Sequence, residues 1–152
     1  MSISEDRFTR GWISGTCGGF IGAIFGLLFK YIGISKLCVS DWAAILIFGR
    51  TPPFSILDHL YAILILAGTV GVVGIIFAYL LPLINDENIY FKGLIIFTIP
   101  WWFIFLLSAL AKLEGTLNLS VKTTLANGLS IAIMAFLAVY IYRRLEPKNV
   151  SE

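Results

Sequence analysis

Charged residues are scarce in this chain. Of its 152 residues, 13% are charged and 59% are hydrophobic, whereas soluble domains carry roughly 25% charged residues. This shortage argues against an ordinary soluble domain and indicates a lipid bilayer as the surrounding solvent. The net charge is only +2 and no basic run is present, which argues against nucleic acid as a partner. The length suits one domain, and we expect a single transmembrane domain over residues 1–152.

Histidine and cysteine are equally rare. The single histidine, His59, excludes bis-histidine haem ligation within the chain. No cysteine and histidine cluster has zinc spacing, and no glycine-rich phosphate loop precedes a helix with its lysine. Cys17 and Cys38 are 21 positions apart, which is about 20 Å or more if Cys17 lies in a helix and too far for a disulfide. We therefore predict no catalytic residue, no metal site and no cofactor.

Four long uncharged runs dominate the rest of the sequence. A helix needs about 20 residues to cross a hydrocarbon core of roughly 30 Å. Each run meets that length and is apolar around its whole circumference, unlike a surface helix. The alternating pattern of a membrane barrel is absent. The sequence predicts an all-α fold, an integral membrane four-helix bundle, with spans at about 11–33, 57–83, 91–112 and 122–143.

A shorter apolar stretch lies between the first two spans, and we predict a helix over about 41–49. At eight uncharged residues it reaches only about 12 Å as a helix, too short to cross. Ser40 and Asp41 are good N-terminal caps. Gly49 is a good C-terminal stop, and the Pro-Pro pair at 52–53 prevents continuation. We predict a short interfacial or re-entrant helix.

Lysine and arginine are distributed almost evenly between the two sides of the predicted bundle. Positive residues favour the cytoplasmic side of a membrane protein. The side that holds both termini carries six of them and the other side carries five. We expect a multi-pass protein of the cell membrane with both termini in the cytoplasm.

Small residues repeat at helical spacing in the first two spans. Such spacing lets helix backbones approach closely in lipid. Two readings stay open: the ridges pack these spans against each other within the monomer, or they form a face for a second copy or a larger membrane complex. The ridge residues are Gly11, Gly15, Gly18, Gly19, Gly22 and Gly26 in the first span and Gly71 and Gly74 in the second.

Two tryptophans lie in the middle of the third span, after Pro100. Tryptophan normally favours the membrane interface, as Trp42 of the short helix would. Pro100 frees the carbonyl of Ile96, which could accept a hydrogen bond from an indole. Alternatively, Trp101 and Trp102 form the wall of a cavity for a lipid, a quinone or another flat ligand.

Four ionisable residues flank the short helix. Asp58 follows Ser55 by three positions, which is a capping pattern for the second span, and His59 comes next. Asp41 and Arg50 are about 13 Å apart on a regular helix, so they pair only if its ends bend together. Their ordinary role is to anchor the spans at the headgroups, and the alternative is the mouth of a binding site.

The layout resembles small four-span bacterial membrane proteins of the YqhR kind, in which a glycine-rich first span is followed by a short loop helix and three more spans. The resemblance implies a bacterial inner-membrane location and transfers no activity. It covers most of the chain and depends on Gly11, Gly15, Gly19, Asp41, Trp42, Gly49 and Arg50.

Three hypotheses of function follow. The first is a non-enzymatic bundle that self-associates or serves as a small subunit through the first span. The second is a transporter or binding protein for a small solute, an ion or a lipid- or quinone-type ligand. The third is a lipid-modifying enzyme, and no set of residues in the sequence supports its chemistry.

In the fourth span, Asn127 and Ser130 are expected to form interhelical hydrogen bonds.

Overall fold

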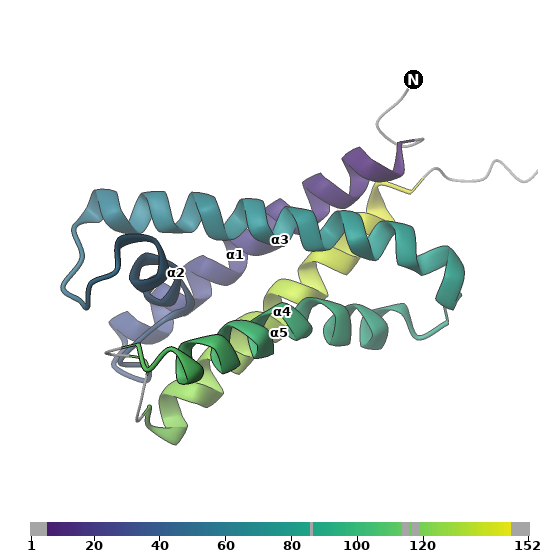
Figure 1. Ribbon diagram of the computed structural model, residues 1–152. Helices are drawn as coiled ribbons and strands as arrows, with labels where there is room; N and C mark the ends of the chain where they lie inside the picture. Colours follow the sequence, from purple (N-terminus) through teal and green to yellow (C-terminus); the bar gives the residue numbers. More distant parts are fainter. Residues whose placement is uncertain (1–5, 86, 114–115, 117–118, 147–152) are drawn as a thin grey trace, which may run out of the picture.

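The computed structural model describes residues 6–85, 87–113, 116 and 119–146. Within them it is all-helical, and four helices are long and apolar enough to cross a membrane. The predicted all-α membrane fold, with a short helix between the first two spans, is confirmed. The helices are α1 (Arg7–Tyr31), α2 (Val39–Phe48), α3 (Ile56–Ile84), α4 (Ile89–Leu110) and α5 (Val121–Arg144). Figure 1 shows the long helices running between the same two ends of the bundle, with α2 near one end.

Polar caps set where three of the long helices begin. Asp6 accepts hydrogen bonds from the first-turn amides of α1, so that helix begins at Arg7 instead of residue 11. Ser55 and Asp58 form the predicted capping box of α3, and Ser120 caps α5. Each cap satisfies amides that a helix start leaves without partners. These side chains extend the helices slightly beyond the uncharged runs.

The backbones of α1 and α3 touch along one glycine ridge. A methyl group at Gly74 would collide with the carbonyl oxygen of Gly11, and one at Gly15 would collide with the carbonyl oxygen of Val70. A methyl group at Gly19 would lie 2.9 Å from the Cα of Ala67. Side chains cannot relieve such contacts, because backbone atoms form both sides. On α3, Gly71 likewise makes room for Thr16 and Trp12 of α1.

The second glycine ridge of α1 faces α5. A methyl group at Gly18 would lie 2.8 Å from the Cβ of Ala138, and one at Gly22 would lie 2.6 Å from the Cβ of Met134. A methyl group at Gly26 would lie 3.5 Å from the Cβ of Cys38, just before α2. The chain itself therefore covers both ridges, and α1 packs between α3 and α5.

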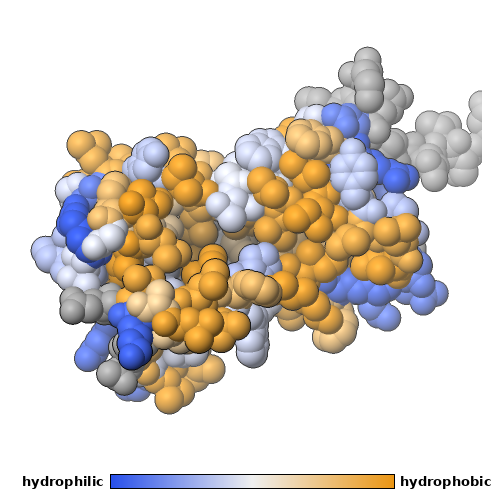
Figure 2. Space-filling model, viewed as in Figure 1, coloured by the Kyte–Doolittle hydropathy of each residue, from blue (hydrophilic) through white to orange (hydrophobic). Residues whose placement is uncertain are grey.

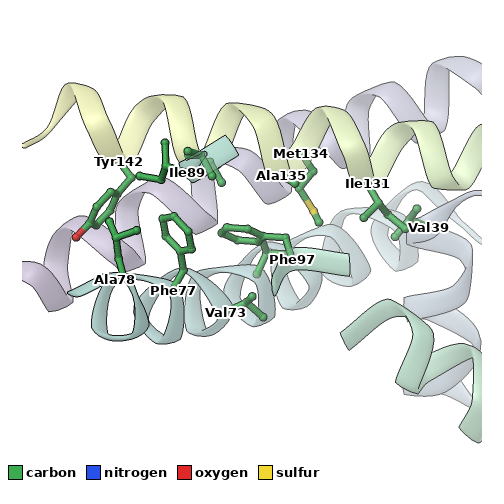
Figure 3. Packing of buried hydrophobic residues seen from close by; sticks show 14 residues of the cluster. Val39, Val73, Phe77, Ala78, Ile89, Phe97, Ile131, Met134, Ala135 and Tyr142 are labelled. Carbon is green, nitrogen blue, oxygen red and sulfur yellow. The ribbon is translucent and has the colours of Figure 1, made fainter. Parts of the chain in front are cut away.

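The apolar core lies between α3, α4 and α5. Figure 3 shows Phe77 of α3 and Phe97 of α4 side by side, with Tyr142 of α5 beyond them. The rings of Phe77 and Phe97 are 5.8 Å apart, and those of Phe77 and Tyr142 are 5.5 Å apart. Figure 2 shows apolar surface between two ends where hydrophilic residues gather, as expected for a membrane-spanning bundle.

Candidate functional site around helix α2

Helix α2 begins two residues earlier than its sequence suggested. Its first residue is Val39, and the N-cap is Cys38. The Cys38 amide donates a 2.8 Å hydrogen bond to the Asp41 carboxylate. Asp41 therefore lies in the first turn and is not the cap, so the prediction of Ser40 and Asp41 as caps is wrong. The C-terminal prediction is confirmed, because Gly49 ends the helix in the left-handed conformation, with φ of 63°.

The Asp41 carboxylate is fully buried and held by groups from three parts of the chain. Lys30, in the last turn of α1, donates to both carboxylate oxygens at 2.7 and 2.8 Å. The thiol of Cys38 also donates to it, at 3.2 Å. His59 Nε2, in the first turns of α3, lies 3.8 Å away. We call these four residues the Asp41 cluster.

The Asp41 cluster stabilises the position of α2. A buried carboxylate without a counter-charge costs several kcal/mol, and Lys30 supplies that charge while its side chain stays 32% exposed. Lys30 thus reaches from the aqueous edge into the bundle along its own alkyl chain. The pair connects the end of α1 to the start of α2.

The thiol of Cys38 is not an activated nucleophile. Burial raises the pKa of Cys38, and the negative charge of Asp41 raises it further. A reactive cysteine needs the opposite environment, in which positive charge lowers the thiol pKa. Among the described residues, no group of three His, Cys, Asp or Glu side chains could hold a metal ion. The Asp41 cluster therefore has the chemistry of a buried ion pair.

Arg50 belongs to a separate ion pair at the outer end of α2. Its guanidinium lies 2.5 Å from the Asp58 carboxylate and donates to the Pro53 carbonyl at 3.0 Å. The side chain also lies 5.1 Å above the ring of Phe54. Arg50 is thus paired with Asp58, whereas Asp41 is paired with Lys30. Of the four ionisable residues expected to flank the short helix, Asp41 thus lies near His59, and Arg50 pairs with Asp58.

Trp42 packs against the middle of α4. Its ring lies 5.5 Å from that of Trp101, edge to face, and stacks on Phe105 at 5.0 Å. Trp101 is roughly 13 Å along the helix from the end of α4 at Leu110. Trp42 is 1% exposed, so it does not face the headgroups as its sequence position suggested. This packing favours the re-entrant form of α2.

An apolar cavity of about 120 Å³ lies beside this aromatic contact. Figure 2 shows the surface hollowed between α3 and α4, next to α2. Trp42, Trp101 and Ala43 line the cavity together with Leu66 and Thr69 of α3. The indole Nε1 of Trp42 is buried and has no hydrogen-bond partner. The cavity thus combines apolar walls with a residue whose donor lacks an acceptor.

The two central tryptophans of α4 have different surroundings. Trp101 faces α2, whereas Trp102 is 72% exposed and lines a different, open cavity. Across the described part of the chain, no indole donates to the carbonyl of Ile96, so that predicted hydrogen bond is not formed. Helix α4 continues through Pro100. Only Trp101 shares a cavity with residues of α2.

Comparisons of this chain with protein-family models, with curated proteins and with solved structures find no match. The site is therefore interpreted from its own residues, and the resemblance to YqhR-like proteins stays a prediction.

Sequence reasoning missed two members of the Asp41 cluster, Lys30 and Cys38. The chain reverses after α1 at Gly33, whose φ is 79°, and this reversal brings Lys30 within reach of a residue eleven positions later. A buried acid needs a nearby cation, and the nearest candidates in sequence were Lys36, Arg50 and Lys30, at 5, 9 and 11 positions from Asp41. Asn127 does bond outside its helix, donating to the Leu37 carbonyl at 3.0 Å.

Ser130 differs from Asn127 in this respect. Its hydroxyl donates to the carbonyl of Ala126, one turn earlier in α5, at 3.0 Å. The hydrogen bond stays within one helix, so the predicted interhelical role of Ser130 is wrong.

Proposed function

We propose that this multi-pass membrane protein is a non-enzymatic binding protein that takes a lipid-soluble ligand with a flat, oxygen-bearing ring into the cavity beside α2. The apolar cavity between α2, α3 and α4, walled by Trp42 and Trp101, is the observation that carries the proposal. The ligand reaches it sideways from the bilayer between α3 and α4.

The size of the cavity suits one ring. An apolar cavity of about 150 Å³ in another protein binds benzene, and this one measures about 120 Å³. Its walls come almost wholly from aliphatic and aromatic side chains, as is typical of small-ligand pockets. A ring fits beside Trp101, while an attached apolar tail stays in the lipid.

The chemistry of the cavity favours an oxygen acceptor on that ring. A buried N–H without a partner is costly, so buried indoles usually find an acceptor. A quinone-type carbonyl is flat and weakly polar, and it would accept from the Trp42 indole after that ring turns its buried N–H toward the cavity. A saturated acyl chain would fill the space but leave this donor unpaired.

The Asp41 cluster supports this function by holding α2 in place. Asp41 and Trp42 are neighbours in sequence, so the ion pair with Lys30 positions the cavity wall. The carboxylate already accepts from Lys30 and Cys38, which leaves it poorly suited to carry a transported ion. Binding therefore fits the site better than transport.

Tryptophan fluorescence tests the proposal directly. The detergent-purified protein is titrated with a short-chain benzoquinone, which quenches tryptophan emission. Saturable quenching is expected in the wild type, on top of a linear collisional component from probe dissolved in the micelle. Ala43→Phe fills the cavity with a ring of its own and should abolish the saturable component.

Trp102→Leu is the control, because Trp102 follows Trp101 on α4 but lines a different cavity. It should keep the saturable component. Trp42→Phe keeps a ring and removes the indole donor, so the apparent Kd should rise about three- to tenfold. Quenching that is equally saturable in Ala43→Phe and in the wild type would reject the proposal.

Self-association through α1 has less support. The expected face consisted of the glycine ridges, and α3, α5 and Cys38 cover those glycines within the chain. A second copy could reach them only if α1 left its neighbours. Gly18→Leu and Gly22→Leu should therefore unfold the monomer, and a folded monomer in place of a wild-type oligomer would favour the subunit hypothesis instead.

The orientation is part of the same proposal. We place both termini in the cytoplasm of a bacterial inner membrane, because the side that holds both termini carries six lysines and arginines against five on the other side, and positive residues favour the cytoplasm. Reporter fusions at the two termini should both report the cytoplasmic side. A periplasmic signal from either terminus would overturn this placement.

A further inference from the structure

Arg10 is buried near the start of α1 and forms no ion pair with the described residues. The exposed fraction of Arg10 is 5%, and its Nε and Nη1 atoms have no hydrogen-bond partner. The guanidinium carbon lies 5.0 Å from the centroid of the Tyr142 ring. The face of the ring attracts the cation, but it does not replace an oxygen acceptor for the N–H groups. Burial of a guanidinium that lacks an ion-pair partner is costly, and a nearby anion would lower that cost.

The nearest acids do not supply that anion. Asp6 accepts hydrogen bonds from the amides of Phe8 and Thr9 and from the Thr9 hydroxyl. Among the described residues, the ion pairs are Lys30–Asp41, Arg50–Asp58 and His59–Asp41, and Arg10 belongs to none of them. Glu146 lines the same cavity without pairing with Arg10.

Arg10 borders an open cavity of about 340 Å³ at the end of the bundle that holds both termini. Its walls come from α1, α3 and α5 and include Arg7, Pro82, Asn85 and Tyr142. Figure 3 shows the Tyr142 hydroxyl pointing away from Phe77 and the rest of the apolar core. Two arginines, an amide and the carboxylate of Glu146 thus border an open space that is separate from the cavity beside α2.

We infer that Arg10 and Arg7 bind a phosphate group at this end of the bundle. Arginine is the preferred partner of phosphate, because its planar fork offers several charge-assisted hydrogen bonds. The amide of Asn85 can donate one more. Phosphate oxygens would accept from the guanidinium where Arg10 lines the cavity, and a small rotation of the side chain would bring the buried Nε and Nη1 within their reach.

The headgroup of an anionic phospholipid is the favoured source of that phosphate. The cavity lies at the ends of spanning helices, where lipid headgroups are found, and basic pockets between such helices bind anionic headgroups. Leu81 and Pro82 form an apolar part of the wall, against which the glycerol backbone can pack. Free inorganic phosphate offers the same oxygens without the apolar part.

A thermal-shift titration separates these sources. The protein is purified in an uncharged detergent, and its Tm is measured with added phosphatidylglycerol, phosphatidylcholine or inorganic phosphate. Phosphatidylglycerol should raise the Tm saturably, whereas the other two should not. Native mass spectrometry should show bound phosphatidylglycerol on the same sample.

The variants identify the residues. In Arg10→Gln the apparent Kd for phosphatidylglycerol should rise about tenfold or more. Arg7→Gln should raise it about fivefold, and because Arg7 is exposed this change leaves the fold intact. Arg143→Gln makes the same charge change at an exposed position outside the cavity. It should change the Kd less than twofold in high salt, which screens exposed charges.

Two results would change the inference. If inorganic phosphate alone raises the Tm, and Arg10→Gln and Arg7→Gln cancel the effect, the phosphate site stands and its lipid source is rejected. If phosphatidylglycerol raises the Tm equally in the wild type, Arg7→Gln and Arg143→Gln, the site itself is rejected. Neither result bears on the quinone-type ligand, because the two cavities share no residue.

Discussion

The trio α1, α3 and α5 and the single helix α4 are built differently. In the most apolar 18-residue window of α4 only 17% of the residues are buried, against 39% in α1 and α3 and 44% in α5. Helix α1 meets both α3 and α5 through glycine and alanine, with backbones in contact. Helix α4 instead presents large side chains such as Phe103 and Leu106 to its surroundings.

The difference shows that apolarity does not decide which helices pack closely in this protein. Lipid tails are as apolar as leucine, so burial of large side chains gives little drive for association within a bilayer. Close contact comes from small residues, whose backbones can meet. The loose packing of α4 leaves space beside α2, and the candidate ligand cavity occupies that space.

The largest expected effect is on the contact between α1 and α3. Gly74→Ala places a methyl group against the backbone of Gly11 and should lower the free energy of unfolding by about 3 kcal/mol. Gly68→Ala, on the same helix, meets only the ring of Trp12 at 4.0 Å. Gly68→Ala should leave the free energy of unfolding unchanged. Unfolding in mixed micelles with increasing dodecyl sulfate measures both, and equal stabilities would refute the close contact.

The ion pair between Lys30 and Asp41 tests whether α2 is fastened to the trio. Lys30→Met leaves a buried carboxylate unpaired and should cost about 3 kcal/mol. Asp41→Asn should cost less, about 1 kcal/mol, because Lys30 is partly exposed and can turn to water. Lys36→Met, at an exposed position in the same loop, is the control. If it matched Lys30→Met in the same unfolding assay, the ion pair would have no special role.

Substitutions on the two faces of α4 should lower the free energy of unfolding by different amounts. Trp101→Leu removes the edge-to-face contact with Trp42 and should cost about 2 kcal/mol. Trp102→Leu changes an exposed side chain and should stay within about 0.5 kcal/mol of the wild type. Denaturant unfolding distinguishes the two. A larger loss for Trp102→Leu would mean that a partner covers the outer face of α4.

The smallest effect concerns hydrogen bonds of α5. Asn127→Ala removes the donor to the Leu37 carbonyl and should cost about 1 kcal/mol. Ser130→Ala removes a hydrogen bond within one helix and should cost about 0.3 kcal/mol or less. Hydrogen exchange at the loop before α2 should rise in Asn127→Ala alone. Faster exchange there in both variants would contradict the distinction.

Local features were predictable from sequence, and pairings between distant parts of the chain were not. The Ser55–Asp58 capping box and the Gly49 stop depend on residues within one or two helical turns, so their pattern is visible in the sequence. The start of α2 was predicted wrongly because Ser40 and Asp41 are both good caps by type. Burial of Asp41 against Lys30 draws it into the first turn and leaves Cys38 as the cap.

The candidate sites divide in the same way. Asp41, Trp101 and Arg50 were recognised as unusual from their residue types and positions, but their partners were not. Trp42 contacts Trp101, 59 positions later in the sequence, and no residue pattern in either segment predicts this contact. Arg10 lies over the ring of Tyr142, which comes from the far end of the chain, and no local pattern predicts this contact.

The sequence by itself determined that this protein has four membrane-crossing helices and one short helix, because hydrocarbon thickness and local caps act on contiguous residues. Only the tertiary structure decided that both glycine ridges of α1 are used within the chain, that Asp41 pairs with Lys30, and that Arg10 faces an open cavity. Those outcomes depend on which helix lies beside which, and in lipid that choice is made by the fit of small residues and not by hydrophobicity.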